Sequence, residues 1–101
     1  MQYVVYRNIG NSDYPYLLDV QSDIIDVLDT RLMIPLFLKG NFKGNVPIRL
    51  CPILTIEESD YIVMTHEMAS IRVSMIGDEV IDVTSHRKKI RDALDFLIDG
   101  F

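Results

Sequence analysis

Short apolar runs separated by polar breaks dominate the first four fifths of the chain. The runs are rich in valine, isoleucine, leucine and tyrosine, and clusters of glycine, asparagine, aspartate and serine bound them. Runs of this composition and length are typical of β-strands, and short polar breaks between them are typical of hairpins. The pattern predicts a mainly antiparallel sheet, with strands at residues 2–6, 16–20, 31–38, 50–56, 61–65 and 69–75, the last closed by Gly77 and Asp78.

Residues 84–101 follow a different period. Their apolar side chains recur at steps of 3, 1, 3, 1 and 3, the repeat of a helix with one buried stripe: Ile90, Ala93, Leu94, Leu97, Ile98 and Phe101. Thr84 or Ser85 can cap the start of this helix, and Gly100 can end it. Phe101 either completes the buried stripe or belongs to an exposed tip. A sheet followed by one amphipathic helix predicts an α+β fold, in which the helix lies across a small curled sheet or partial barrel.

The charges of this helix run against its dipole. Basic residues crowd the positive N-terminal end, whereas Asp92, Asp95 and Asp99 lie toward the negative C-terminal end, opposite the apolar stripe. This charge order destabilises the helix. Two ion pairs spaced i, i+4, Lys88 with Asp92 and Arg91 with Asp95, offset part of that destabilisation. A consistent violation of a local rule is typical of functional surface, although a solvated helix face has the same pattern.

Composition narrows the classes of function. A chain of 101 residues, of which 49% are hydrophobic, is expected to form a single domain over residues 1–101 with surplus apolar surface that favours self-association. The net charge of −5 disfavours direct binding to nucleic acid and favours a protein or small-molecule partner. Residues 1–7 lack the pattern of a secretory leader, and Pro35 interrupts the longest apolar stretch, 32–38. These features predict a cytoplasmic protein with no membrane span.

The residues that could carry chemistry form no recognised motif. His66 and His86 lack metal-binding spacing, and Cys51, the only cysteine, lies in an apolar run with no base beside it in the sequence. Acidic residues recur at steps of three or four between 19 and 29, but without a nearby histidine this run is interpreted as an exposed, partly helical turn. The sequence therefore predicts a core cysteine, no enzyme activity, no cofactor and no metal ion.

Several segments resemble the CcdB family of toxins. The most specific of them is the run Asp-Val-Gln-Ser-Asp-Ile-Ile. The resemblance extends over essentially the whole chain, and the segments that carry it are residues 18–25, 31–36, 64–70, 74–80, 85–87 and 99–101. It implies an SH3-like partial barrel with a small additional sheet and a C-terminal helix. It also implies a homodimeric toxin of a type II toxin–antitoxin pair, which binds the DNA gyrase A subunit, traps the gyrase-cleaved DNA complex and is neutralised by a CcdA-type antitoxin.

Two sets of residues are expected to bind partners: the resemblance implies the first, and the second follows from the charges of the last helix. The gyrase-binding set is Ile24, Ile25, Asp95, Ile98, Asp99, Gly100 and Phe101. The antitoxin-binding set is Arg87, Lys88, Arg91, Asp95 and Asp99, whose basic members are an expected contact for an acidic antitoxin.

Two alternatives to a gyrase poison stay open at this point. An mRNA-cleaving toxin on the similar MazF-like barrel needs a general base and cations around the scissile phosphate, for which His66, Glu67 and Arg72 are the candidates. A degenerate family member would bind only its antitoxin.

Overall fold

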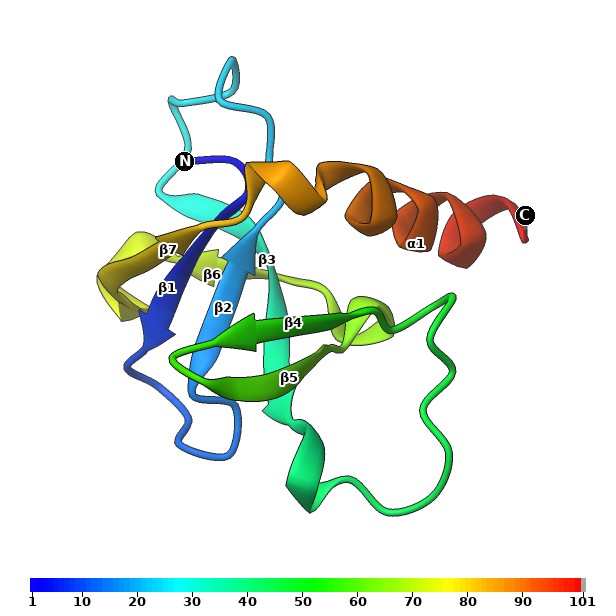
Figure 1. The fold of residues 1–101 in the computed structure, drawn as a ribbon. Helices are drawn as coiled ribbons and strands as arrows, with labels where there is room; N and C mark the ends of the chain where they lie inside the picture. The colour runs from blue at the N-terminus through cyan, green and yellow to red at the C-terminus, as the bar shows by residue number, and fades with distance from the viewer. Residues whose placement is uncertain (101) are drawn as a thin grey trace.

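Seven strands and one helix make up the computed structural model, which describes residues 1–100 (Figure 1). The strands are β1 (Val4–Asn8), β2 (Tyr16–Asp19), β3 (Thr30–Leu38), β4 (Ile53–Ile56), β5 (Ser59–Val63), β6 (Ala69–Arg72) and β7 (Ile76–Asp82). The helix α1 covers Arg87–Asp99. Single 3₁₀ turns lie at η1 (Lys39–Asn41), η2 (Thr65–Glu67), η3 (Val73–Met75) and η4 (Thr84–His86).

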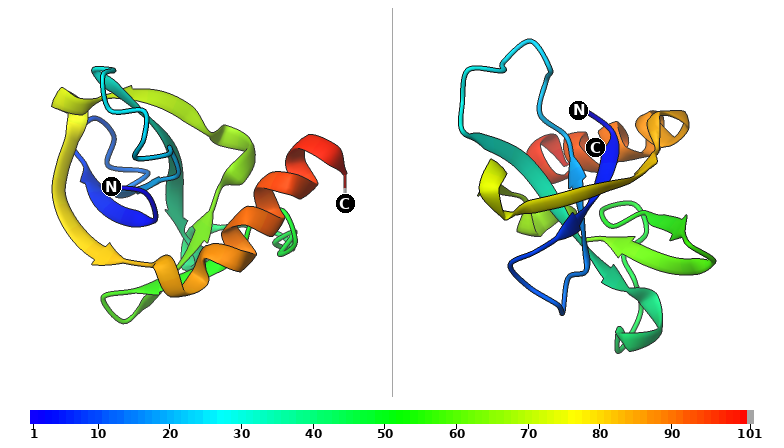
Figure 2. Two further views of the ribbon diagram at one scale, coloured as in Figure 1. Left: turned by 90° about the horizontal axis from the view of Figure 1, so that it is seen from above. Right: turned by 90° about the vertical axis from the view of Figure 1, so that its left-hand side faces the viewer.

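All strand pairs are antiparallel, in the order β4-β5-β3-β2-β1-β7, with β6 also paired to β3. The long strand β3 serves two neighbours: its first half pairs with β6 and its last three residues pair with β5. Register shifts between β1 and β7 bend the sheet, and seen from above the strands form an open ring beside α1 (Figure 2). The predicted α+β fold, a mainly antiparallel SH3-like partial barrel with a C-terminal helix, is confirmed; the small additional sheet that was predicted is continuous with the barrel strands in one seven-stranded sheet.

The main core lies where one face of the sheet meets the helix. Leu18 of β2, Ile34 of β3 and Leu54 of β4 are fully buried there, and Ile90 of α1 packs into the same cluster. A smaller cluster of Cys51, Ile62 and Met64 lies beneath the segment from Phe42 to Leu50. Cys51 is 1% exposed, which confirms its prediction as a core residue.

Strand β7 is absent from the sequence prediction, which ended the sheet at Gly77 and Asp78. Its residues include glycine and three carboxylates, which have low strand propensity, and it forms because β1 offers a free edge to pair with. Gly77 allows the close approach of the two strands, because a Cβ at this position would lie 3.1 Å from the Arg7 carbonyl oxygen and would require β1 to shift by a few tenths of an ångström.

Two further predictions about local structure are wrong. The acidic segment 22–29 contains turns and bends but no helical element. Neither Thr84 nor Ser85 caps α1 with its side chain, because both lie in the 3₁₀ turn η4 that precedes the helix. The N-cap position is His86, which makes no side-chain cap hydrogen bond. In the described part of the chain, no helix is both long and apolar enough to cross a membrane.

Candidate protein-binding surfaces

The two halves of α1 have different surroundings. Ile90 and Ala93 in the first half are buried against the sheet, whereas the second half extends past the strands (Figure 2). The apolar stripe continues to the end of the helix, yet Leu97 is 38% exposed and Ile98 is 73% exposed. The sequence pattern is therefore that of a buried stripe, but the sheet of this chain covers only the first half of the stripe.

Gly100 ends the helix as predicted. It adopts the left-handed conformation with φ of 79°, and its N–H donates to the Phe96 carbonyl at 2.9 Å. Asp95 and Asp99 are exposed, as their position opposite the apolar stripe predicted. Phe101 lies outside the described residues, so both interpretations of its side chain stay predictions.

Arg49 contacts the exposed half of the helix. Its guanidinium lies 4.4 Å from the centroid of the Phe96 ring, which is a cation–π contact. About two turns earlier in the helix, the Lys89 ammonium donates to the Ile53 carbonyl at 2.7 Å. The first contact joins α1 to the segment before β4, and the second joins it to the first residue of β4. Sequence reasoning missed Arg49, because nothing in the local pattern shows that a loop arginine meets an aromatic ring of the last helix.

Substitution of Arg49 by alanine is expected to loosen the end of α1. A cation–π contact at an exposed site contributes about 0.5–1 kcal/mol against local opening. Its loss should therefore make amide exchange in residues 94–99 about 2–5-fold faster. Hydrogen–deuterium exchange measures this directly. Lys43→Ala, at an exposed position in the same segment, is the matched control. Equal exchange in the two variants would show that Arg49 does not position the helix end.

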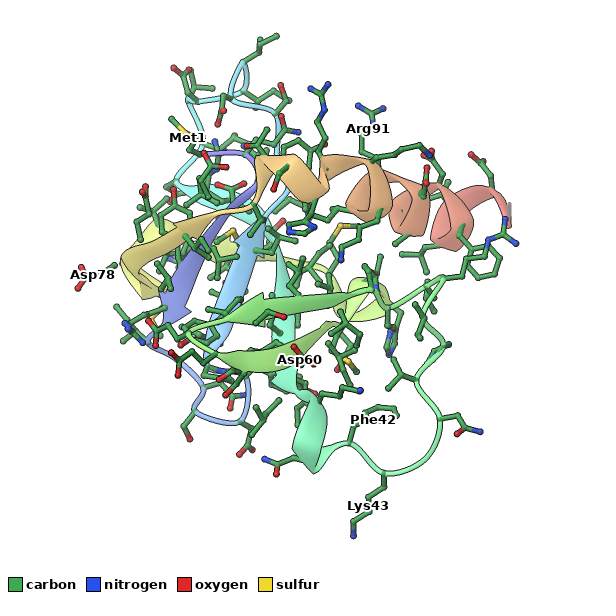
Figure 3. All side chains as sticks on the ribbon, viewed as in Figure 1. Met1, Phe42, Lys43, Asp60, Asp78 and Arg91 are labelled. Carbon is green, nitrogen blue, oxygen red and sulfur yellow. The ribbon has the colours of Figure 1, made fainter. Side chains whose placement is uncertain are left out.

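A polar groove of about 650 Å³ runs along the start of the helix, lined by Gln2, Tyr3, Arg87, Lys88, Arg91, Asp92 and Asp95. Lys88 pairs with Asp92 at 3.0 Å, which confirms one of the two predicted i, i+4 pairs. Arg91 points away from the sheet (Figure 3). The first turn contains no acidic residue, so the cations and the helix N-terminus make this end positive. Four of the five predicted antitoxin-binding residues line this groove; only Asp99 does not.

The other predicted binding segment is the loop between β2 and β3. Ile24 is 91% exposed and Ile25 is 49% exposed. Asp23 anchors the loop, because its Oδ1 accepts hydrogen bonds from the Gln2 N–H and from Arg31 Nη2, each at 3.0 Å. The Gln2 N–H bond and the Arg31 guanidinium lower the pKa of Asp23 below its ordinary value. The exposed isoleucines are therefore displayed by an ordered loop.

The two parts of the predicted gyrase-binding set lie apart within one protomer. Figure 1 and the view from above in Figure 2 place the 22–29 loop on the side of the N-terminus, away from the free end of α1. Ile24 and Ile25 therefore do not form one continuous surface with Ile98 and Gly100 in a single chain.

The candidate nuclease residues face two different cavities. Glu67 and Arg72 line one of about 370 Å³, whereas His66 lines another of about 250 Å³ beneath the 42–50 segment. There His66 Nδ1 lies 3.7 Å from Cys51 Sγ, and burial raises the pKa of that thiol. The structure thus places an imidazole beside Cys51 that the sequence did not show, while burial disfavours the thiolate that a nucleophile needs. Within residues 1–100, no group of three or more histidine, cysteine or acidic side chains could hold a metal ion.

These features describe a small SH3-like half-barrel with an exposed apolar helix end, an ordered apolar loop and a polar groove at the start of α1. The family model described as CcdB protein matches residues 2–100, so the chain belongs to the CcdB family. The protein is thus a toxin of a toxin–antitoxin pair.

Proposed function

We propose that this protein is a DNA gyrase poison that binds the gyrase A subunit and holds the gyrase-cleaved DNA complex. The observation that carries the proposal is the free end of α1, where Ile98 is 73% exposed beside Asp95 and Asp99. An exposed apolar side chain at the end of a pre-formed helix suits a protein contact. Membership of the CcdB family supports gyrase as the target.

Such a toxin acts through binding and carries out no chemistry of its own. A ligand that binds the DNA-cleaved state of gyrase more tightly than its other states shifts the population toward the cleaved state. Neither a catalytic group nor a cofactor is needed for this effect. We therefore propose that the protein is not an enzyme and that it acts in the cytoplasm, where gyrase and DNA are present.

We further propose that a CcdA-type antitoxin binds along the groove at the start of α1. Arg87 and Arg91 offer guanidinium groups for bidentate bonds to the carboxylates of an acidic segment. Asp95 lies both in this groove and in the predicted gyrase-binding set. An antitoxin bound there would cover part of the surface that gyrase needs, which is a simple basis for neutralisation.

Homodimerisation is also part of the proposal. One protomer holds the 22–29 loop and the helix end apart, so these two parts can meet only if a second copy brings its loop to the first copy's helix. A two-fold dimer creates two such combined surfaces. This arrangement suits gyrase, whose A subunits are themselves paired.

The test uses purified protein with gyrase and plasmid DNA. We expect inhibition of supercoiling together with accumulation of cleaved DNA. The proposal would be overturned if the protein neither inhibits supercoiling nor accumulates cleaved DNA at concentrations where a gyrase-binding relative does both. An RNA incubation in parallel tests the nuclease alternative: metal-independent cleavage that is lost in His66→Ala would replace the gyrase assignment.

A further inference from the structure

The free end of α1 is supported on one side by the segment that precedes β4. Leu94 is the last residue of the helix that packs against the main core. Two residues later, Phe96 is half-buried, and the guanidinium of Arg49 lies 4.4 Å from the centroid of its ring. This contact therefore supports a part of the helix that the core does not hold.

Arg49 is carried by a turn that is itself anchored. The N–H groups of Leu50 and Cys51 both donate to the Pro47 carbonyl, at 2.9 and 2.8 Å. Cys51 is buried, and Leu50 packs against the smaller core cluster around it. The backbone at Arg49 is thus fixed on the barrel, and its guanidinium reaches the ring of Phe96 from a fixed base.

The helix is held at two points along one of its faces. Lys89 and Phe96 are seven positions apart, so they point in nearly the same direction and lie about 10 Å apart along the axis. The Lys89 ammonium donates to the Ile53 carbonyl at 2.7 Å, and Phe96 contacts Arg49. A cleft of about 450 Å³ lies between the helix and residues 48–53. A helix held at both points pivots less freely than one held only at its first half.

Ile98 lies on a different side of the helix from this support. It follows Phe96 by two positions, which corresponds to a rotation of about 200° about the helix axis. The contact with Arg49 therefore lies behind the side chain of Ile98, which is 73% exposed. Arg49 acts on a partner of Ile98 through the direction of the helix, and not through a contact of its own.

We propose that Arg49 is a positioning residue for the gyrase-binding end of α1: by stacking on Phe96 it fixes the direction in which Ile98 is presented. This inference rests on the proposed function and deepens it, since Arg49 lies outside the predicted gyrase-binding set. A partner does not have to order a helix end that is already held, which favours binding. Without the cation–π contact the partner must order it, which corresponds to about 2–5-fold weaker binding.

The test measures affinity for the gyrase A subunit in four proteins: the unaltered chain, Arg49→Ala, Phe96→Leu and the double variant. We expect each single variant to bind about 2–5-fold more weakly than the unaltered chain. The double variant should bind no more weakly than the weaker single variant, because both substitutions remove the same contact. Such non-additivity separates an action through Phe96 from two independent effects.

Two further variants serve as controls. Phe96→Tyr keeps an aromatic ring beneath the guanidinium and should keep the affinity of the unaltered chain. Lys43→Ala removes one positive charge from the same segment, but Lys43 lies far from α1 (Figure 3), so its loss should leave the affinity unchanged. Arg49→Ala itself should shift the melting temperature by no more than about 4 °C, because Arg49 is exposed.

Four outcomes would contradict this assignment. Equal affinity of Arg49→Ala and Lys43→Ala would show that Arg49 does not position the helix end. Additive losses in the double variant would show that Arg49 contacts gyrase directly. A fall in melting temperature of more than ~10 °C in Arg49→Ala would assign its effect to the fold. If the unaltered protein does not bind gyrase, the proposed function itself fails, and the positioning role fails with it.

Discussion

Deletion of residues 99–101 is expected to abolish inhibition of gyrase while leaving the fold intact. The preceding residue, Ile98, is 73% exposed, so the end of the helix contributes little to the core of the protomer. Loss of a contact cluster at the centre of an interface weakens binding by at least ~30-fold. Removal of surface residues changes stability by about 0.5 kcal/mol or less, so the melting temperature should shift by no more than about 4 °C.

Supercoiling assays and thermal unfolding, at the same protomer concentration, separate the two interpretations of Phe101. Retained inhibition would show that gyrase does not bind the helix end. A large loss of stability would instead show that Phe101 packs in a core. Gly100→Ala provides a control of unchanged length, because alanine is strained at a φ of 79° and redirects the last residues without removing them.

The strands and helix that the sequence predicted are those with strong local signals. Strands β2 and β3 are dense in leucine and other large apolar residues, and α1 repeats its apolar residues at helical spacing. Strand β7 was missed because pairing with β1, and not its own composition, makes it a strand. The hairpin between β4 and β5 was predicted from its polar break, but the distant residues that hold its turn were not. Glu57 and Glu58 adopt positive φ there, and Arg7 and Tyr16 hold the Glu57 carboxylate in place.

The candidate surfaces were predictable to the extent that they lie within one segment. The charge order along α1 pointed to the groove that Arg87 and Arg91 line. The contact between Arg49 and Phe96 joins distant segments and leaves no local pattern. The exposure of Val27 and Leu28 in the 22–29 loop was hidden for a different reason. Apolar residues in an acidic run look like the buried side of a turn, and only the structure shows that both point into solvent.

A second large effect is expected at Asp19, the buried carboxylate beneath the 22–29 loop. Its side chain is 2% exposed and accepts two bonds from Arg31, from Nε at 2.8 Å and from Nη2 at 3.1 Å. The Gln21 N–H also donates to Oδ1 at 3.0 Å. Arg31 continues to Asp23, so one ion-pair network joins the barrel interior to the loop.

Asp19→Ala is expected to destabilise the protein by about 3–5 kcal/mol, because it leaves Arg31 without its buried partner. For a chain of this size the melting temperature should fall by more than ~10 °C. Asp60→Ala is the matched control: Asp60 is exposed and accepts one bond from the Thr55 hydroxyl at 2.7 Å, so its loss should change the melting temperature little. Similar melting temperatures for the two variants would show that the Asp19–Arg31 pair does not stabilise the fold. The Asp19 variant should also weaken gyrase binding below its own melting temperature, since Arg31 then no longer holds Asp23 and the loop in one position.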